Sequence, residues 1–297
     1  MPSRRDFLRY LGSGTAAALL PLPNVRLPIG AADGIKVGYA AITWGGNDEQ
    51  AIEDISAVGF PGIQLRAGVL SRFGDRPAEL RDLLARHRLT FVALSSGNVS
   101  IDPALETQMI DEHVAHARFL RDAGGLYLQL IDERPKGRAI APGDHERLGK
   151  VMTEIGKRTA ELGIPIAYHP HLGSIGEKPG DIDRVLDACD PRYVRLLLDV
   201  AHYQAGGGDP VAAVRKYADR LLFLHIKDLR ERRFVELGRG SVDLRGVFAA
   251  LRDVHFSGWA VVELDSVPDK GGTPKESAEI SKRYLRDVIR LPLSSRA

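Results

Sequence analysis

The sequence predicts an α/β fold in which eight parallel strands close into a barrel and eight helices cover the outside. Strand-like apolar runs alternate with helical patterns without a break from Gly34 onward. Such alternation favours parallel pairing, because each helix carries the chain back to the start of the next strand. The 265 residues after the first 32 are close to the roughly 250 that such a barrel typically uses.

Each expected strand is a short apolar run, and each expected helix is a longer stretch with helical periodicity. The strands are expected at 36–43, 62–66, 90–94, 126–131, 164–168, 194–198, 221–224 and 259–262. The helices are expected at 48–58, 77–87, 106–123, 144–162, 180–188, 210–218, 244–253 and 274–289.

An open, doubly wound sheet is the rival arrangement for this order of elements. Such a sheet usually carries a glycine-rich phosphate loop after its first strand. Here the first expected strand is followed by Trp44 and two glycines, and the chain contains neither GxGxxG nor a Walker-type sequence. No linker or low-complexity stretch divides residues 33–297, so one barrel domain is expected.

Composition narrows the class of protein. With 44% hydrophobic and 27% charged residues, the chain can bury one substantial core and is not expected to be disordered. The first 32 residues carry a net charge of +3 within a total of +2, so the remainder carries −1. That remainder shows no basic stripe of the kind that nucleic-acid binding requires. The single cysteine, Cys189, excludes an internal disulfide and any cysteine-based zinc cluster.

Residues 1–32 are typical of a twin-arginine signal segment. Arg4 and Arg5 precede a mildly apolar stretch at 10–22, and small residues at 30–32 form a possible cleavage region. An amphipathic helix with chance arginines is the alternative. The apolar stretch is too short and too interrupted by glycine for a stable membrane span. We therefore expect the twin-arginine export machinery as a partner, a periplasmic location and no membrane insertion after cleavage.

Four of the apolar runs lead into a residue that can bind a metal ion. These residues are His169, Asp199, His225 and Glu263, with steps of 30, 26 and 38 residues between them. Each step is about one strand-plus-helix unit. Because the C-terminal ends of parallel barrel strands meet on one face, the four side chains are expected to converge there. A lone histidine at such a place is often an ordinary hydrogen-bonding residue, but the clustering favours a site.

The mix of donors indicates the kind of ion. Two imidazoles and two carboxylates without a thiolate suit Mn²⁺, Co²⁺, Fe²⁺ or Zn²⁺ better than Ca²⁺. Such an ion could accept the carbonyl and a neighbouring hydroxyl of a sugar. It would then stabilise the enediolate that forms when the α-proton leaves.

Several residues beside the four are candidates for proton transfer or for binding substrate hydroxyls. His171, His202 and Lys227 lie at or just past expected strand ends. Glu263 could act as the base while bound to the ion. Lys227 could instead only pair with Asp228 or a neighbouring carboxylate.

Two further residues are candidates for substrate binding. Trp44 follows the first expected strand and could stack on a sugar ring. Arg66 ends the second and could bind hydroxyls or a carboxylate. Either side chain could equally be packing at the rim.

Five segments in order, 38–45, 168–173, 198–202, 224–228 and 261–263, make the chain similar to the sugar phosphate isomerase/epimerase superfamily with a xylose isomerase-like TIM barrel. It resembles most the inosose dehydratase branch. The resemblance implies a divalent-metal site with Asp199, His225 and Glu263 as ligands. It also implies isomerase, epimerase or dehydratase chemistry on a keto-sugar or inosose.

The fourth ligand position departs from that family's pattern. Epimerase members carry a glutamate at the fifth strand end, where it doubles as one of two proton-transfer bases. This chain has His169 there, and Gln129 on the fourth strand. Elimination, or isomerisation with different bases, is therefore expected over a symmetric two-base epimerisation.

Two other classes of function remain open. One is a non-catalytic periplasmic sugar-binding barrel that has kept the pocket. The other is a metal-dependent endonuclease relative with the same barrel. The expected export, the near-neutral charge of residues 33–297 and the small number of ligands count against the endonuclease.

Overall fold

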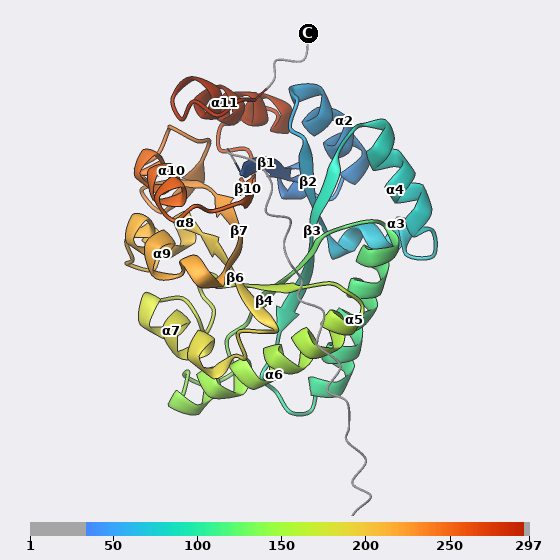
Figure 1. Ribbon diagram of the computed structural model, residues 1–297, viewed down its shortest axis with the longest axis vertical. Coiled ribbons are helices and arrows are strands. Elements are labelled where there is room, and N and C mark those ends of the chain that lie inside the picture. The colour runs from blue at the N-terminus through green and yellow to red at the C-terminus, as the bar shows by residue number, and fades with distance from the viewer. Residues whose placement is uncertain (1–33, 294–297) are drawn as a thin grey trace, which may run out of the picture. The chain divides into compact units, whose positions relative to one another are not determined.

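The fold is a closed barrel of eight parallel strands wrapped by helices, as the sequence predicts (Figure 1). The structure is a computed structural model that describes residues 34–293. Consecutive barrel strands are neighbours, and the last closes the barrel against the first. In chain order the barrel strands are β1 (Ile35–Ala40), β2 (Gly62–Arg66), β3 (Thr90–Val99), β4 (Tyr127–Asp132), β5 (Ile166–His169), β6 (Val194–Asp199), β7 (Leu221–Ile226) and β10 (Gly258–Val262).

Each of the eight expected helices is present and packs on the outside of the barrel (Figure 1). They are α2 (Asp48–Val58), α4 (Pro77–Arg86), α5 (Glu106–Asp122), α6 (Pro142–Glu161), α7 (Pro179–Ala188), α9 (Pro210–Lys216), α10 (Leu244–Asp253) and α11 (Pro274–Asp287).

Local sequence explains where these helices begin. Thr273 and Glu276 form a reciprocal capping box at the start of α11. The Asp243 side chain accepts a hydrogen bond from the backbone N–H of Gly246 and caps α10. Proline follows the cap of α4, α6, α7, α9 and α11, where its missing N–H costs no hydrogen bond.

The structure differs from the expected elements mainly just after the strands. The first strand ends at Ala40, not at residue 43, because the chain turns into a 3-10 helix, η1 (Ala41–Trp44). Gly45 ends that turn with a φ of 64°, a value that favours glycine. β3 runs five residues longer than expected. Short helices that the sequence did not reveal are η2 (Ala67–Val69), α3 (Leu70–Phe73), α8 (Val200–Ala205) and η3 (Ala218–Arg220).

A small antiparallel hairpin follows β7 and was also not expected. It consists of β8 (Asp228–Arg230) and β9 (Arg233–Val235). Its two-residue loop, Glu231 and Arg232, has positive φ at both positions, the geometry of a tight hairpin turn. The Asp228 carboxylate accepts hydrogen bonds from the backbone of Gly238, Gly240 and Val242. This carboxylate fixes the loop behind the hairpin.

An apolar layer inside the barrel supports the four expected ligands. Two residues before each ligand stands a fully buried apolar residue: Ala167, Leu197, Phe223 and Val261. Because side chains alternate along a strand, each shares a face with its ligand. All four belong to one small cluster, distinct from the larger core that includes the helices. The four expected ligands therefore lie directly above a buried apolar layer, at the C-terminal end of the barrel.

The twin-arginine segment expected at 1–32 lies outside the described residues and stays a prediction. Within residues 34–293, no helix has the length and apolar character needed to cross a membrane.

Candidate active site

The four expected ligands meet in one place, although they come from four different strands. His169 ends β5, Asp199 ends β6, His225 lies in β7 and Glu263 follows β10. One nitrogen or carboxylate oxygen from each lies within 4.8 Å of those of the other three, and all four residues are buried. The pairing of β6 with β7 sets Asp199 directly beside His225. The barrel thus brings the four side chains to a common point.

The shortest contacts run from the ring of His225 to the two carboxylates. Nδ1 of His225 lies 3.2 Å from Oε2 of Glu263 and 3.6 Å from Oδ2 of Asp199. The other oxygen of Asp199, Oδ1, accepts hydrogen bonds of 2.9 Å from the backbone N–H groups of Ala201 and His202. These bonds cap α8 and leave Oδ2 directed at the histidines.

Three buried atoms of this cluster have no hydrogen-bond partner among the described residues. They are Nδ1 of His169, Oδ2 of Asp199 and Nδ1 of His225. An unsatisfied buried polar atom costs about 1–3 kcal/mol, so three in one place require compensation. A divalent cation bound between these atoms would provide it, because imidazole nitrogens and carboxylate oxygens are its ordinary ligands. The residues therefore fit a metal ion.

The electrostatics also suit a cation. Burial lowers the pKa of His169 well below its usual range, and the neighbouring His225 lowers it further, so His169 is neutral. Burial acts to raise the pKa of Asp199, but the charged Lys227 ammonium outweighs it and helps to hold that pKa well below its usual range. Neutral imidazole and ionised carboxylate are the protonation states that bind a metal ion.

Lys227 is a fully buried cation beside the cluster. Its ammonium nitrogen lies 3.0 Å from Oε1 of Glu263, 2.5 Å from Oδ1 of Asp265 and 3.9 Å from Oδ2 of Asp199. Burial alone would lower the pKa of Lys227, but these three carboxylates raise it above its usual value. Lys227 therefore stays charged, and its partners are Glu263 and Asp265.

The hairpin covers this lysine from outside. Phe234 in β9 places its ring 4.0 Å from the Lys227 ammonium and 4.8 Å from the ring of His202. The contact with the lysine is a cation–π interaction. The unexpected hairpin thus closes one side of the cluster.

The rings of His171 and His202 are in contact, with centroids 3.9 Å apart and planes tilted by 40°. Of these two residues, His171 lines the main cavity and His202 does not. Nδ1 of His171 donates to the carbonyl oxygen of Leu172 at 2.8 Å, which leaves the Nε2 lone pair free. His202 accepts at Nδ1 from the backbone N–H of Leu172. Burial lowers the pKa of His202 to about 3, so this ring is neutral at physiological pH.

A loop anchored by Asp132 holds His171 in position. The buried Asp132 carboxylate accepts hydrogen bonds from the hydroxyls of Tyr168 and Ser174, both at 3.0 Å. It also accepts from the backbone of Ile175 and Gly176. Ser174 in turn accepts from the backbone N–H of His171.

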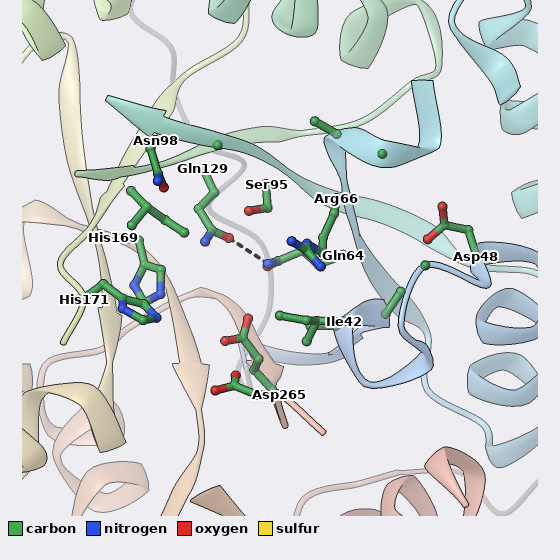
Figure 2. Close-up of a pocket in the computed structure, with 18 residues that line it drawn as sticks. Ile42, Asp48, Gln64, Arg66, Ser95, Asn98, Gln129, His169, His171 and Asp265 are labelled. Carbon is green, nitrogen blue, oxygen red and sulfur yellow. Dashed lines mark hydrogen bonds between the residues drawn. The ribbon is translucent and has the colours of Figure 1, made fainter. Parts of the chain in front are cut away.

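A cavity of about 760 Å³ opens over the cluster at the C-terminal mouth of the barrel (Figure 2). His169 and His171 lie at one end of it, and Asp48 lies at the other (Figure 2). Its polar lining residues are Asp48, Gln64, Arg66, Ser95, Asn98, Gln129, His169, His171, Glu263 and Asp265. The lining offers both hydrogen-bond donors and acceptors to a polar ligand.

The two expected substrate-binding residues lie in different places. Arg66 lines the cavity, as its place at the end of β2 suggests. Trp44 does not: its Nε1 donates to Asp54 at 2.9 Å, and its ring packs edge-on against Tyr39. The reason is the early end of β1, because η1 turns the indole toward α2. We therefore assign Trp44 no contact with a ligand in this cavity.

Sequence reasoning missed Gln64 as a member of the site. Its Oε1 lies 2.9 Å from Nε2 of His225, and its Nε2 donates to Oε1 of Gln129 at 2.7 Å. An amide inside an otherwise apolar strand was the available signal, since a buried polar side chain needs partners.

The sequence matches the model of the xylose isomerase-like TIM barrel family over residues 52–288. The chain belongs to this family.

Within the xylose isomerase-like TIM barrel family, the chain is similar to several curated relatives. An inosose dehydratase of Lacticaseibacillus casei is 26% identical over an alignment 306 residues long. The alignment covers 88% of this chain and 99% of the relative. Among solved structures, the IolI protein with a bound zinc atom has a TM-score of 0.75 at 20% identity. An L-ribulose 3-epimerase has a TM-score of 0.71 at 16% identity. Each superposition covers 88% of this chain and all of the other, and shows a common fold.

Proposed function

We propose that this protein is a divalent-metal-dependent lyase of the dehydratase type that acts on an inosose or a related keto-sugar. One observation carries the proposal: three buried lone-pair atoms, on His169, Asp199 and His225, converge beside a polar cavity without hydrogen-bond partners within residues 34–293. The similarity to inosose dehydratases over nearly the full length supports the reaction class.

His169, Asp199, His225 and Glu263 would hold the ion. When bound, a Mn²⁺, Co²⁺, Fe²⁺ or Zn²⁺ ion would supply Lewis-acid stabilisation of negative charge on a substrate carbonyl oxygen. Proton transfer and substrate binding would be performed by the protein's own side chains.

His171 is the group best placed to move the substrate proton. It lines the cavity, and its Nδ1–H bond to the Leu172 carbonyl leaves Nε2 as a proton acceptor. Lys227 binds one oxygen of Glu263, and the other oxygen faces His225 across the proposed ion site. The buried His202 ring does not line this cavity. We therefore assign His171 as the base, and an elimination with one base needs no second proton-transfer group of the kind that a two-base epimerisation requires.

The proposed elimination balances with this one residue. Nε2 of His171 takes the proton from the carbon next to the carbonyl, and that electron pair forms the new carbon–carbon double bond. The bond from the β-carbon to its hydroxyl breaks, and the leaving oxygen receives the proton from the His171 imidazolium. The products are an unsaturated ketone and water, so no oxidant or reductant is needed.

The rest of the cavity suits a polyhydroxylated ring. Ser95, Asn98 and Gln129 present short neutral polar groups, and Arg66 presents a cation (Figure 2). Several hydrogen-bonding groups around one cavity are what distinguishes the hydroxyls of one sugar from those of another.

Metal removal and replacement test this proposal. The chelator-treated protein is expected to neither dehydrate inosose nor exchange its α-proton for deuterium in D₂O. Adding Mn²⁺, Co²⁺, Fe²⁺ or Zn²⁺ singly should restore both reactions. Metal-loaded protein that exchanges no α-proton on a broad panel of inososes and keto-sugars would contradict the enzyme and favour a sugar-binding barrel.

A further inference from the structure

We infer that the side-chain amides of Gln64 and Gln129 form a hydrogen-bonded amide chain between the metal site and the cavity, and that each N–H in it donates in the direction of the cavity. Gln64 is a positioning residue that fixes which nitrogen of His225 faces the ion. Gln129 ends the chain with an N–H donor for a substrate oxygen. The metal and substrate parts of this inference rest on the proposed function, whereas the direction of the chain is a property of the protein alone.

The amide chain crosses the inside of the barrel. His225 lies in β7, Gln64 in β2 and Gln129 in β4. The His225–Gln64 contact is 2.9 Å and the Gln64–Gln129 bond, dashed in Figure 2, is 2.7 Å. Both glutamines are almost completely buried, with 3% and 2% of their surface exposed. One buried amide contacts the candidate metal ligand His225 and the second contacts the first, which is unlike the apolar layer beneath them.

The direction of the chain follows from the chemistry of an amide. An amide nitrogen only donates hydrogen bonds, and an amide oxygen only accepts them. Because Nε2 of Gln64 donates to Gln129, its Oε1 faces His225, which must donate from Nε2. A neutral imidazole, the form that binds a metal ion, carries one N–H, so in that form Nδ1 of His225 presents a lone pair.

That lone pair faces the expected ion. Nδ1 of His225 lies 3.2 Å from Oε2 of Glu263 and 3.6 Å from Oδ2 of Asp199, with no hydrogen bond to either. Three lone-pair atoms that face one another repel unless a cation lies between them. Outer hydrogen bonds of this kind orient ligating histidines and fix their tautomer. Gln64 would do so here.

The amide chain ends at the cavity. Gln129 lines the cavity, and its amide nitrogen has no hydrogen-bond partner among residues 34–293. It is also absent from the buried unpartnered atoms of that range, so the cavity reaches it. Every N–H of the chain therefore points away from the metal site and toward the ligand. A hydroxyl or carbonyl oxygen of the substrate is the matching acceptor.

The direction of the hydrogen bonds in the amide chain can be measured without metal, substrate or activity. Nitrogen NMR of the chelator-treated, histidine-labelled protein distinguishes the two tautomers, and the His225 signal is assigned by its loss in His225→Asn. We expect His225 to carry its proton on Nε2 and to have an unprotonated Nδ1. The Nδ1–H tautomer would overturn it, even if the wild-type protein binds metal and is active.

Two variants of Gln64 then separate orientation from packing. Gln64→Met keeps the size but loses both hydrogen bonds, and should lower metal affinity about 10- to 100-fold with a mixed His225 tautomer. Gln64→Glu still accepts from Nε2–H, so it should keep the tautomer and an affinity near that of the wild type. Equal affinity in Gln64→Met and wild type would overturn the positioning role. Circular dichroism confirms that each variant is folded.

Gln129→Glu tests the other end. Its carboxylate can still accept from Gln64 but cannot donate to a substrate, so metal affinity should hold while KM rises about 3- to 10-fold, the effect of one lost hydrogen bond. An unchanged KM would overturn the role of Gln129. If the wild-type protein binds no metal at all, the proposed function fails, but the tautomer measurement still decides the direction of the chain.

Discussion

The ammonium nitrogen of Lys227 lies 3.0 Å from Oε1 of Glu263, and both side chains are buried beside the candidate metal ligands. The site therefore has a fixed positive charge even without an ion. This charge offsets part of the repulsion among Asp199, Glu263 and Asp265. We therefore expect Lys227 to contribute to the stability of the metal-free barrel.

Replacing Lys227 with methionine should destabilise the metal-free protein. The change leaves two carboxylates unpaired, and breaking a buried ion pair costs about 3–5 kcal/mol; because Asp265 reaches the cavity, we expect the lower end. Urea unfolding measures this free energy. Lys216→Met is the matched control: its partner Asp183 is at the surface, so at most about 1 kcal/mol is expected. Equal losses in the two variants would refute the role of Lys227.

Replacing His171 with glutamine should stop proton transfer without releasing the metal. Loss of a positioned general base lowers the rate about 10²- to 10⁴-fold. Deuterium exchange and metal content are measured on the same sample. His202→Gln is the comparison, and a smaller loss is expected because this ring does not line the cavity. A His171→Gln protein with full exchange activity would exclude His171 as the base.

His113 gives the protein a pH dependence that is independent of the metal site. Burial and the neighbouring His116 lower the pKa of His113 to about 4, against an ordinary value near 6.5. Because the folded-state pKa is the lower one, the unfolded chain binds the proton first as pH falls. The associated stability, about 3 kcal/mol, is present above pH 6.5 and is lost progressively toward pH 4.

His113→Gln should therefore weaken the pH dependence of unfolding between pH 6.5 and pH 4 by about 3 kcal/mol. Urea unfolding at several pH values, with chelator present, measures the difference between variant and wild type. His116→Gln is the control and should change the dependence less, because His116 is less buried. Parallel curves for His113→Gln and wild type would contradict the prediction.

Export is expected to depend on the arginine pair at the N-terminus. Changing Arg4 and Arg5 together to lysine should leave the protein in the cytoplasm, because the twin-arginine pattern is the feature that predicts this route. Cell fractionation with an antibody against the barrel measures the distribution. Unchanged periplasmic accumulation of the double variant would exclude this route.

The barrel and its ligand cluster could be predicted because each rests on a local pattern that the fold preserves. Alternation of apolar runs and helical stretches gives the topology. A polar residue directly after an apolar run, as at Asp199 or Glu263, is placed at the mouth of the barrel by the parallel arrangement alone. Such positions depend little on loop conformation.

What escaped prediction depends on turns and on contacts distant in sequence. The sequence left Trp44 open between contact with a ligand and packing, because where its indole lies depends on the chain leaving β1 three residues earlier than the apolar run suggests. Gln64 contacts His225 across 161 positions, which no local pattern encodes. The hairpin that carries Phe234 depends on Asp228 binding backbone groups up to 14 residues away.

Metal titration of wild type and Asp199→Asn tests the central claim most directly. One oxygen of Asp199 caps a helix, and the other lies in the cluster without a hydrogen-bond partner in the part of the chain that the structure describes. The amide keeps the shape and an oxygen but loses the charge. Calorimetry with Mn²⁺, Co²⁺ or Zn²⁺ on chelator-treated protein should give one ion per wild-type chain and at least about 100-fold weaker binding to the folded variant. Equal affinity in both proteins, or no binding to the wild type, would contradict the site.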